Sequence, residues 1–579
     1  MINKYQQLVS LDHWRERLAA TDALPQLTIL GVLIGVISGL IILLFHGLMD
    51  WSEVLLLPNH QVEGFESLSP QWRFAFPVIG AVLVALLWSW LPSSDRDVGL
   101  GHILVRLVGH QAWLPMKNAL AQFVAAVVLI VSGNSVGREG PSVHLGAASG
   151  SLLGQWLHLP NNSLRVLVAC GSAAAIASAF NTPIAGVIFA LEVVMLEFQL
   201  ASLLPVIASA VTATVVVRIA YGDFSVFSVP PTALASLWEL PFLVGLGLVV
   251  GVVAAGYCRS LSWVQHRSGE WPLWLRFILA GLITGLIALQ VPQVMGVGYD
   301  TVSQALLGEL GVKLLLLVFA AKLLATTLAI GLGLPGGMIG PTLVIGACLG
   351  GALGELGQQL VPVDTALPGF YVIMGMAAMM GSVFQAPLAA LMALVELTDN
   401  ANILFPGMLV MVVSNLVSRQ LWTGKTLTGW LLQQRGLSLS GDPISRVLQQ
   451  VGIEQIMERN FESCSRYLSL AQAEALVQQN PKWLLIQDEQ QWVCGMPTAE
   501  LSRYLAHDEL GATEPLDLLG FAAQRNDITW VERHISCDQA QTLLAKKTVE
   551  LLAVRWLSAS GKQTIKGVVS AEHLQRAWQ

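Results

Sequence analysis

The chain has 579 residues, of which 54% are hydrophobic and only 12% charged, and its formal net charge at pH 7 is −7. This composition excludes an ordinary soluble protein of this length, and the modest negative charge gives no indication of a nucleic-acid partner. The six cysteines are scattered without a metal-type pair, so neither a disulfide framework nor a zinc or other metal site is expected.

Apolar segments dominate most of the chain and recur from Leu27 to about residue 423. Segments such as 27–45 and 313–332 reach the roughly 20 residues that a helix needs to cross a bilayer. Shorter ones, such as 183–193, predict tilted, broken or re-entrant helices, which are stable in a membrane only when buried in protein. The sequence therefore predicts an all-α polytopic membrane region, and its 53 glycines fit close helix packing in lipid.

The sequence GREGP at 137–141 places Arg138 and Glu139 between two apolar stretches. We interpret it as the start of a helix, where unpaired N–H groups and a partial positive charge can bind an anion. Glycine lets the backbone approach the ion, and proline in the first turn lacks an N–H that would have no partner there. Glu139 is itself an anion when ionised, so it can occupy this site and leave it on protonation. This predicts a gate, a proton carrier or both; the alternative is that Glu139 pairs with Arg138 and only caps a helix.

The apolar region contains an internal repeat. GREGP returns as GMIGP at 337–341, and the segment 180–193 returns without gaps at 384–397. Two matches in the same order indicate a duplication, and duplicated transporter folds place their site where the halves meet. We therefore expect the two helix starts to converge on one anion.

Three other charges fall inside apolar segments. Glu192 and Glu396 occupy matched positions of the repeat, which predicts structural hydrogen bonds near helix ends. Lys322 lies within an apolar run and predicts a snorkelling or paired charge that adds positive potential to the pathway.

Charged side chains are more than twice as dense beyond residue 434 as before it, so residues 435–579 predict a soluble domain. This region has a weak repeat of its own, because CGMPTAELSRYLA at 494–506 resembles KGVVSAEHLQRAW at 566–578. Each copy is expected to read helix, strand and repeated segment, with the helices and strands at 470–479, 482–493, 537–547 and 549–565.

These motifs resemble those of the CLC family of chloride channels and transporters, and the resemblance covers most of residues 27–432. GREGP is a signature of that family, and GGMIGP at 336–341 is similar to its second anion-binding signature, with Ile339 in the place of a phenylalanine. The resemblance implies the CLC fold, with two inverted structural repeats at roughly 27–222 and 236–432. It also implies a homodimer with one anion pore per subunit.

The resemblance further implies a domain order and a location in the bacterial inner membrane. Residues 1–26 are expected to form a cytoplasmic N-terminal segment, residues 27–434 the anion-transport domain in the lipid bilayer, and residues 435–579 a cytoplasmic domain. That last domain is similar to a tandem CBS pair, whose implied role is regulatory, with adenine nucleotides as candidate ligands. Leu501 and His573 stand where the nucleotide-binding pattern has Asp, which argues against a nucleotide and leaves a structural or dimer-stabilising tail as the alternative. No other cofactor is expected.

Carried over residue by residue, the resemblance assigns Glu139 as the external gating glutamate. The backbone amides of Met338 and Ile339 are expected to line the anion site, and those of Gly137, Arg138 and Glu139 to lie on its outer side.

Two departures from the family pattern affect side-chain ligands of the anion. The signature GSGIP corresponds to GLGHI at 99–103, so Leu100, beside Gly101, replaces the serine whose hydroxyl faces the central anion. The pore tyrosine of the family aligns with Thr428, which could still donate a hydrogen bond. Both hydroxyl ligands are therefore changed, so chloride and other small anions are the expected substrates. His102 in the same loop is an alternative donor or simply a polar loop residue.

A third departure concerns protons, for which Glu139 and Glu192 are the candidate path. Many antiporters of the family carry a second acid immediately after the residue at position 192, but here Val193 follows. A valine cannot relay a proton, so the sequence favours channel-like or weakly proton-coupled conduction. The alternative is a coupled chloride/proton antiporter in which Glu192, Glu197 or water replaces the missing acid.

Two other function classes remain as alternatives. A magnesium transporter would need acidic oxygens along its pore, whereas the glycine motifs offer N–H donors. An intramembrane enzyme could use Glu139 with His144 as acid and base, but no nucleophile or metal cluster accompanies them. We expect His144 to face a neighbouring helix turn, and we predict no catalytic residues.

Overall fold

The computed structural model divides the chain into two compact units. One holds Leu24–Leu157 with Leu164–Leu439, here called the membrane unit, and the other includes Ser440–Gln579, here called the C-terminal unit. The segment 1–26, expected to be cytoplasmic, lies outside the described residues as far as Ala23. The structure describes residues 24–198, 200–223, 226–227, 229, 233–360, 366–422, 426–435, 437, 451–488, 491–506, 515–532, 535, 537–547, 550–557 and 563–576.

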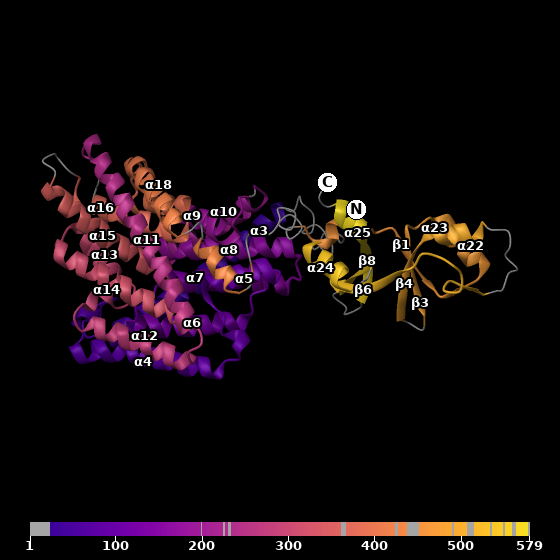
Figure 1. Ribbon diagram of the computed structural model, residues 1–579, viewed down its shortest axis with the longest axis horizontal. Helices are drawn as coiled ribbons and strands as arrows, with labels where there is room; N and C mark the ends of the chain where they lie inside the picture. Colours follow the sequence, from indigo (N-terminus) through magenta and orange to yellow (C-terminus); the bar gives the residue numbers. More distant parts are fainter. Residues whose placement is uncertain are drawn as a thin grey trace. The chain divides into compact units, whose positions relative to one another are not determined.

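The described part of the membrane unit is helical (Figure 1). Eight helices among the described residues are long and apolar enough to cross a membrane. The helices are α3 (Leu24–Leu56), α4 (Pro70–Trp90), α5 (Gly99–Gly109), α6 (Met116–Val131), α7 (Glu139–Trp156), α8 (Asn161–Phe180), α9 (Pro183–Phe189), α10 (Leu200–Tyr221), α11 (Leu240–Ser268), α12 (Leu273–Ala288), α13 (Tyr299–Leu307), α14 (Val312–Gly331), α15 (Ile339–Leu360), α16 (Pro368–Phe384), α17 (Pro387–Thr398), α18 (Leu404–Leu421) and α19 (Leu427–Gln433).

The duplication predicted from the motifs is visible in the packing of these helices. Helix α3 packs against α10 in the first half, and α11 packs against α18 in the second. Across the halves, α4 packs against α12 and the short α9 against α17. The segment 183–193 is short as predicted, since α9 ends at Phe189 and continues as a π-helical turn, Ala190–Met195.

Glycines allow the same close helix crossing in both halves. A Cβ atom on Gly146 of α7 would lie 2.2 Å from the carbonyl oxygen of Gly171 in α8. At the matched crossing of α15 and α16, a Cβ on Gly346 would lie 2.4 Å from the carbonyl oxygen of Gly375. Larger side chains would push these backbones apart, so the glycines let two buried helices approach the centre of the unit.

The C-terminal unit contains a six-stranded sheet in the order β1-β3-β4-β6-β7-β8. Strand β1 runs parallel to β3 and β3 antiparallel to β4, and the same pattern recurs for β6, β7 and β8. An antiparallel pairing of β4 with β6 joins the two copies. The strands are β1 (Phe461–Ser465), β2 (Tyr467–Leu468), β3 (Trp483–Asp488), β4 (Gln491–Pro497), β5 (Leu516–Asp517), β6 (Asn526–Glu532), β7 (Leu551–Leu557) and β8 (Gln563–Ser570).

The predicted helices at 470–479 and 537–547 are α22 (Leu470–Gln479) and α24 (Cys537–Lys547). Helices α21 (Ile453–Ile456), α23 (Thr498–Leu505) and α25 (Ala571–Arg576) complete the described helices of this unit. The prediction of one strand per copy was wrong: the runs 482–493 and 549–565 each contain the end of one strand and the start of the next. Both runs have polar residues in their middle, where the chain reverses direction.

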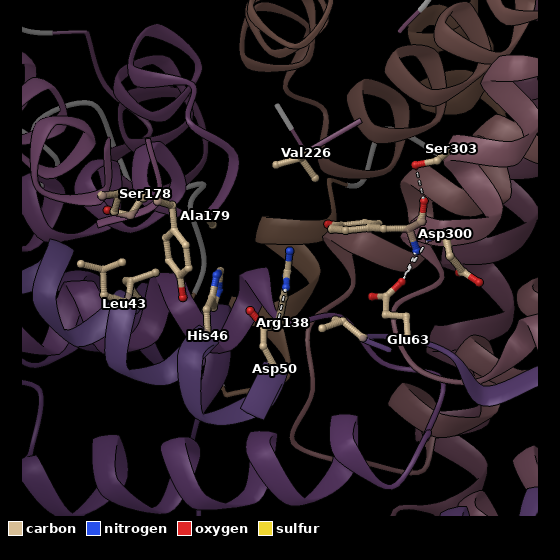
Figure 2. Close-up of a pocket in the computed structure, with 15 residues that line it drawn as sticks. Leu43, His46, Asp50, Glu63, Arg138, Ser178, Ala179, Val226, Asp300 and Ser303 are labelled. Carbon is tan, nitrogen blue, oxygen red and sulfur yellow. Dashed lines mark hydrogen bonds and ion pairs between the residues drawn. The ribbon is translucent and has the colours of Figure 1, made fainter. Parts of the chain in front are cut away.

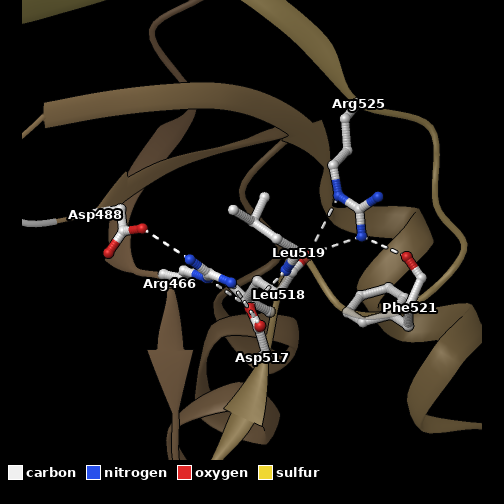
Figure 3. Close-up of polar contacts among 7 residues, drawn as sticks. All are labelled: Arg466, Asp488, Asp517, Leu518, Leu519, Phe521 and Arg525. Atoms are coloured by element: carbon white, nitrogen blue, oxygen red, sulfur yellow. Dashed lines mark hydrogen bonds and ion pairs between the residues drawn. The ribbon is translucent and has the colours of Figure 1, made fainter.

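A cluster of charges ties the short strand β5 to the first copy (Figure 3). Arg466 donates to both carboxylate oxygens of Asp517 at 2.9 Å, and to Asp488 at 2.9 Å. Nearby, Arg525 donates to the carbonyl of Leu518 at 2.9 Å. The paired arrangement of Arg466 and Asp517 is the bidentate geometry typical of strong arginine–carboxylate contacts.

Candidate anion-binding site

The two repeated glycine loops meet inside the membrane unit. The N–H of Gly137 donates to the carbonyl of Gly337, and the N–H of Gly337 donates to the carbonyl of Gly137, both at 2.8 Å. Helix α7 begins at Glu139 and α15 at Ile339, so both helix N-termini lie beside this junction. A Cβ atom on Gly140 would lie only 2.6 Å from the Cα of Gly337. The predicted convergence of two helix starts is therefore confirmed.

The Glu139 carboxylate lies at the N-terminus of the helix from the other half. Its side chain is 0% exposed, and its Oε2 accepts a hydrogen bond of 3.0 Å from the N–H of Gly340. Its Oε1 accepts a hydrogen bond from the hydroxyl of Tyr299. Arg138 Nε is 3.8 Å from Oε1, so its attraction is electrostatic and longer than a hydrogen bond. The carboxylate thus occupies the position that a helix N-terminus offers to an anion.

One side of this junction opens into a cavity of about 450 Å³, here called the Arg138 cavity. Its wall includes His46, Asp50, Glu63, Arg138 and Tyr299. Figure 2 shows His46, Asp50 and Glu63 pointing into it around Arg138, whose Nη1 is 3.9 Å from Asp50 Oδ1. Arg138 therefore lies between two acidic side chains and the gate carboxylate.

The other side opens into a cavity of about 360 Å³, here called the Arg435 cavity. It brings together most residues that the sequence assigned to the anion path. Its wall includes Leu100, Gly101, His102, Gly140, Gly337, Met338, Ile339 and Arg435.

Glu139 separates the two cavities. The residue before it, Arg138, lines one cavity, the residue after it, Gly140, lines the other, and the Glu139 side chain between them is fully buried. Any ion that passes from one cavity to the other must displace this carboxylate.

Thr428 is placed differently from the other candidates. Its hydroxyl is buried within hydrogen-bonding distance of the Thr426 hydroxyl, at 3.1 Å. Among the described residues of α19 and the turn after it, Leu431, Gln434 and Arg435 line the Arg435 cavity and Thr428 does not. The hydroxyl of Thr428 is therefore committed to the cap of α19.

The histidine predictions require correction. His102 lies in helix α5 instead of a loop, and its Nδ1 is 2.9 Å from Nε2 of His144 in α7. Arg106 Nε donates to His102 Nε2 at 3.1 Å, so the proton of His102 sits on Nδ1 and is donated to His144. His144 consequently faces another histidine and not merely a helix turn, and its Nε2 is an acceptor.

Glu192 and Glu396 confirm their predicted structural role, in a reciprocal arrangement. Glu192 accepts hydrogen bonds from the N–H groups of Leu388 at 3.3 Å and Ala389 at 2.8 Å, at the start of α17. Glu396 accepts them from Ile184 at 2.9 Å and Ala185 at 2.7 Å, at the start of α9. Each glutamate caps the short helix of the opposite half, and Glu192 lines neither of the two cavities.

The prediction for Lys322 was wrong. Its side chain is 0% exposed and does not snorkel to a surface. Its Nζ donates to the carbonyls of Val294 at 3.0 Å and Gly296 at 2.8 Å. The fold uses this ammonium group to hold the segment that leads into α13, because buried carbonyls there need donors.

The sequence analysis missed Tyr299, the first residue of α13. The only available signal was an aromatic residue carrying a hydroxyl directly after the glycines 296 and 298. Glu63 fixes the start of this helix by accepting from the N–H of Tyr299 at 2.6 Å. Burial, followed by the charge of Asp300, raises the pKa of the Glu63 carboxyl, which lies in the loop after α3, to about 7.

The C-terminal unit has its own cavity, of about 780 Å³. Lys482, Asn526, Gln541 and Glu550 contribute polar groups to its wall. The two positions considered for nucleotide binding are not on that wall. Leu501 is part of an apolar core cluster, and His573 hydrogen-bonds to Ser570.

Residues 80–419 match the family model for the voltage gated chloride channel. The chain belongs to the CLC family. It is 34% identical to a ClcB-like chloride channel protein of Ralstonia nicotianae over 59% of this chain and 82% of the relative. It is 28% identical to the H(+)/Cl(-) exchange transporter ClcA of Vibrio cholerae over 70% of this chain and 88% of the relative. The solved structure of a slow cyanobacterial Cl-/H+ antiporter has the same fold, with 24% identity, a TM-score of 0.63, and coverage of 71% of this chain and 98% of that one.

Membership of the CLC family makes this a multi-pass membrane protein and a chloride transporter, as the motifs implied. It also identifies the two repeated halves with the inverted repeats of the CLC fold. The strands and helices of the C-terminal unit are compatible with a CBS pair, which stays a prediction.

Proposed function

We propose that this CLC protein conducts chloride through a pathway gated by Glu139, with little or no obligatory coupling to protons. The observation that carries the proposal is the position of the carboxylate, which fills the N-terminal site of α15 between two cavities. A small anion and an ionised carboxylate compete for the same donors, because both are stabilised by the helix dipole and free N–H groups.

Protonation would open the gate by removing the charge that holds the side chain in place. A neutral carboxyl gains little from the helix N-terminus, so it can swing into the Arg138 cavity and leave the site to chloride. We propose that this cavity faces the outside and the Arg435 cavity the inside. Backbone donors at Met338 and Ile339 would then receive the anion, since Leu100 offers no hydroxyl. A magnesium pathway has no comparable support, because these groups are hydrogen-bond donors, and nothing at the junction supports catalysis.

Weak proton coupling is favoured by the use that the fold makes of the inner acids. Val193 is buried and apolar, and Glu192 is engaged as the cap of α17. Neither provides a free carboxyl on the route between Glu139 and the Arg435 cavity. Proton binding at Glu139 would therefore regulate chloride flux without a fixed exchange ratio.

The second candidate is coupled chloride/proton antiport, the activity named for the ClcA relative. The observation that favours it is the pair of His102 and His144. His102 lines the Arg435 cavity, and His144 belongs to α7, so titratable side chains connect that cavity with the helix that carries the gate.

We also propose the cellular setting implied by the family. The protein would act as a homodimer in the bacterial inner membrane with cytoplasmic termini. Its C-terminal unit would act as a CBS-type regulatory or dimer-stabilising domain without an adenine nucleotide, in keeping with the positions of Leu501 and His573.

The test is chloride efflux from loaded liposomes across a range of pH, with proton movement recorded in the same vesicles. Wild type should release chloride faster at acidic pH with no fixed proton countermovement, and Glu139→Gln should make the flux insensitive to pH. Glu309→Gln, an exposed glutamate outside the site, serves as the matched control and should keep the wild-type profile. Stoichiometric proton movement that disappears in Glu139→Gln would establish the antiporter instead. A wild-type pH profile in Glu139→Gln would refute the gate assignment.

A further inference from the structure

The hydroxyl of Tyr299 reaches the gate from an element that carries none of the predicted site residues. Tyr299 opens α13, and its hydroxyl donates to Oε1 of Glu139 while the N–H of Gly340 donates to Oε2. The carboxylate therefore has one backbone donor from α15 and one side-chain donor from α13. A Cβ atom on Gly340 would lie 3.3 Å from the Tyr299 hydroxyl, which shows that both donors surround the same small space.

Tyr299 is held so that its hydroxyl cannot turn away easily. Its ring packs edge-on against Phe227, with 5.1 Å between ring centroids, and the guanidinium carbon of Arg138 lies 5.2 Å from the ring centre. Glu63 accepts from its N–H, and the Ser303 hydroxyl donates to its carbonyl at 3.0 Å. A donor that is fixed before its acceptor arrives loses little conformational freedom on binding.

The other two places where a hydroxyl was expected do not supply one to the junction. Leu100 lines the Arg435 cavity with an apolar side chain, and Thr428 directs its hydroxyl to Thr426. When the Glu139 side chain leaves, the donors that remain in its former position are the N–H of Gly340 and the hydroxyl of Tyr299. An O–H donor suits a halide or another small anion as well as it suits a carboxylate.

We propose that Tyr299 is the side-chain ligand of the site occupied by the Glu139 carboxylate, donating to that carboxylate when the gate is closed and to the transported anion when the gate is open. This inference rests on the proposed function of Glu139 as the gate. Tyr299 acts on gating by positioning Glu139, and it contacts the anion directly once the carboxylate has left.

The closed gate should become easier to open when this donor is lost. A hydrogen bond to an ionised acceptor stabilises the charged form, so its removal favours protonation and release of the side chain. The other charged or titratable groups around the junction are unchanged by a substitution at Tyr299. They are His46, Asp50 and Glu53 on α3, Glu63 in the loop after it, Arg138 beside the gate, Asp300 on α13 and Lys322 on α14.

The experiment compares Tyr299→Phe with wild type in the same liposome assay. The midpoint of the flux-against-pH curve should move toward alkaline pH by about one unit, which corresponds to a roughly tenfold change in the ratio of closed to open gates. In a Glu139→Gln background, where no ionised carboxylate competes, Tyr299→Phe should lower the apparent chloride affinity by roughly tenfold.

Tyr257→Phe is the matched control. Tyr257 is a buried tyrosine of α11 whose hydroxyl has no hydrogen-bond partner, so this variant should keep the wild-type midpoint and chloride affinity. Replacing Tyr299 with a fluorinated tyrosine keeps its shape and strengthens the donor, so it should move the midpoint toward acidic pH. This second variant tests the proposal even if Tyr299→Phe does not fold.

The results separate this inference from the proposed function. If Glu139→Gln abolishes the pH response but Tyr299→Phe and fluorotyrosine both leave the midpoint and the chloride affinity unchanged, Tyr299 is not a ligand and the gate assignment stands. If Glu139→Gln keeps the wild-type pH response, the gate assignment fails and the inference about Tyr299 fails with it.

Discussion

Helices α7 and α15 begin at equivalent positions of the two halves, α7 with Glu139 and α15 with Ile339. Both side chains are buried, and the loops before them exchange the same pair of backbone hydrogen bonds through Gly137 and Gly337. The duplicated backbone supplies two helix N-termini, but only one half supplies a titratable group. Glu139 then binds to the N-terminus that belongs to Ile339 and Gly340, so the half without an acid provides the site and the half with an acid provides the gate.

The second repeated block shows the opposite case. Glu192 and Glu396 are present in both halves and perform the same task, each capping a helix of the other half. An acid that the duplication keeps in both copies therefore serves the fold here, whereas the acid found in a single copy serves transport. Three substitutions test this distinction at decreasing strength.

Gly140→Ala should have the largest effect, because it attacks the shared backbone. The new methyl group would lie 2.6 Å from the Cα of Gly337, where no side-chain rotation can relieve the contact. We expect a loss of stability of about 3 kcal/mol and of chloride flux, as the loops are forced apart. Thermal unfolding in detergent and liposome efflux measure the two effects.

Gly245→Ala is the control for that substitution, since a Cβ at Gly245 of α11 meets nothing within 4 Å. It should leave both readouts unchanged. Wild-type stability and flux in Gly140→Ala would show that the two loops need not touch for the site to form.

Glu192→Gln and Glu396→Gln should have equal, intermediate effects. Each replaces a carboxylate that accepts two N–H bonds at a helix start with a neutral amide, which should lower stability by about 1 kcal/mol. The pH dependence of chloride flux should survive in both variants. Loss of that dependence in Glu192→Gln alone would place Glu192 on a proton path and break the symmetry of the pair.

The smallest effect is expected in the C-terminal unit, which is also duplicated but has its Arg466 cluster in the first copy. Arg466 holds the pKa of the Asp517 carboxyl below its usual value. This stabilisation is present above the unfolded-state pKa of about 3.9 and is lost as the pH falls through the lower, folded-state pKa. Asp517→Asn should therefore increase hydrogen exchange of β2 and β5 slightly at pH 7 and not at strongly acidic pH.

The exposed pair of Arg503 and Glu500 provides the comparison for that substitution. Arg503→Gln should leave exchange of β2 and β5 unchanged at every pH. If Asp517→Asn behaves in the same way, the bidentate contact with Arg466 contributes nothing to the first copy.

The sequence was informative wherever a residue type repeated or was costly to bury. GREGP and GMIGP predicted two helix starts that meet, and the matched Glu192 and Glu396 predicted structural caps. Both inferences depended on local chemistry that a duplication makes visible. They needed no knowledge of which distant segments touch.

The contacts that the sequence did not reveal depend on tertiary structure. Tyr299 touches Glu139 across 160 positions of sequence and has no marked counterpart in the repeat. Lys322 binds backbone carbonyls, which every segment of the chain possesses, so no sequence pattern could have identified them. His102 looked like a loop residue because it follows the glycines 99 and 101, yet α5 begins at Gly99 and turns it toward His144.

The exchange of caps between Glu192 and Glu396 has the form of an isologous contact, in which the same patch on two partners binds its own copy. A half-length precursor with a single such glutamate would have satisfied its short helix only by pairing with a second molecule about a two-fold axis. Fusion of two such molecules into one chain would have freed each copy to change independently everywhere except at this mutual bond. Two separately expressed halves of the present chain should accordingly find each other through this seam.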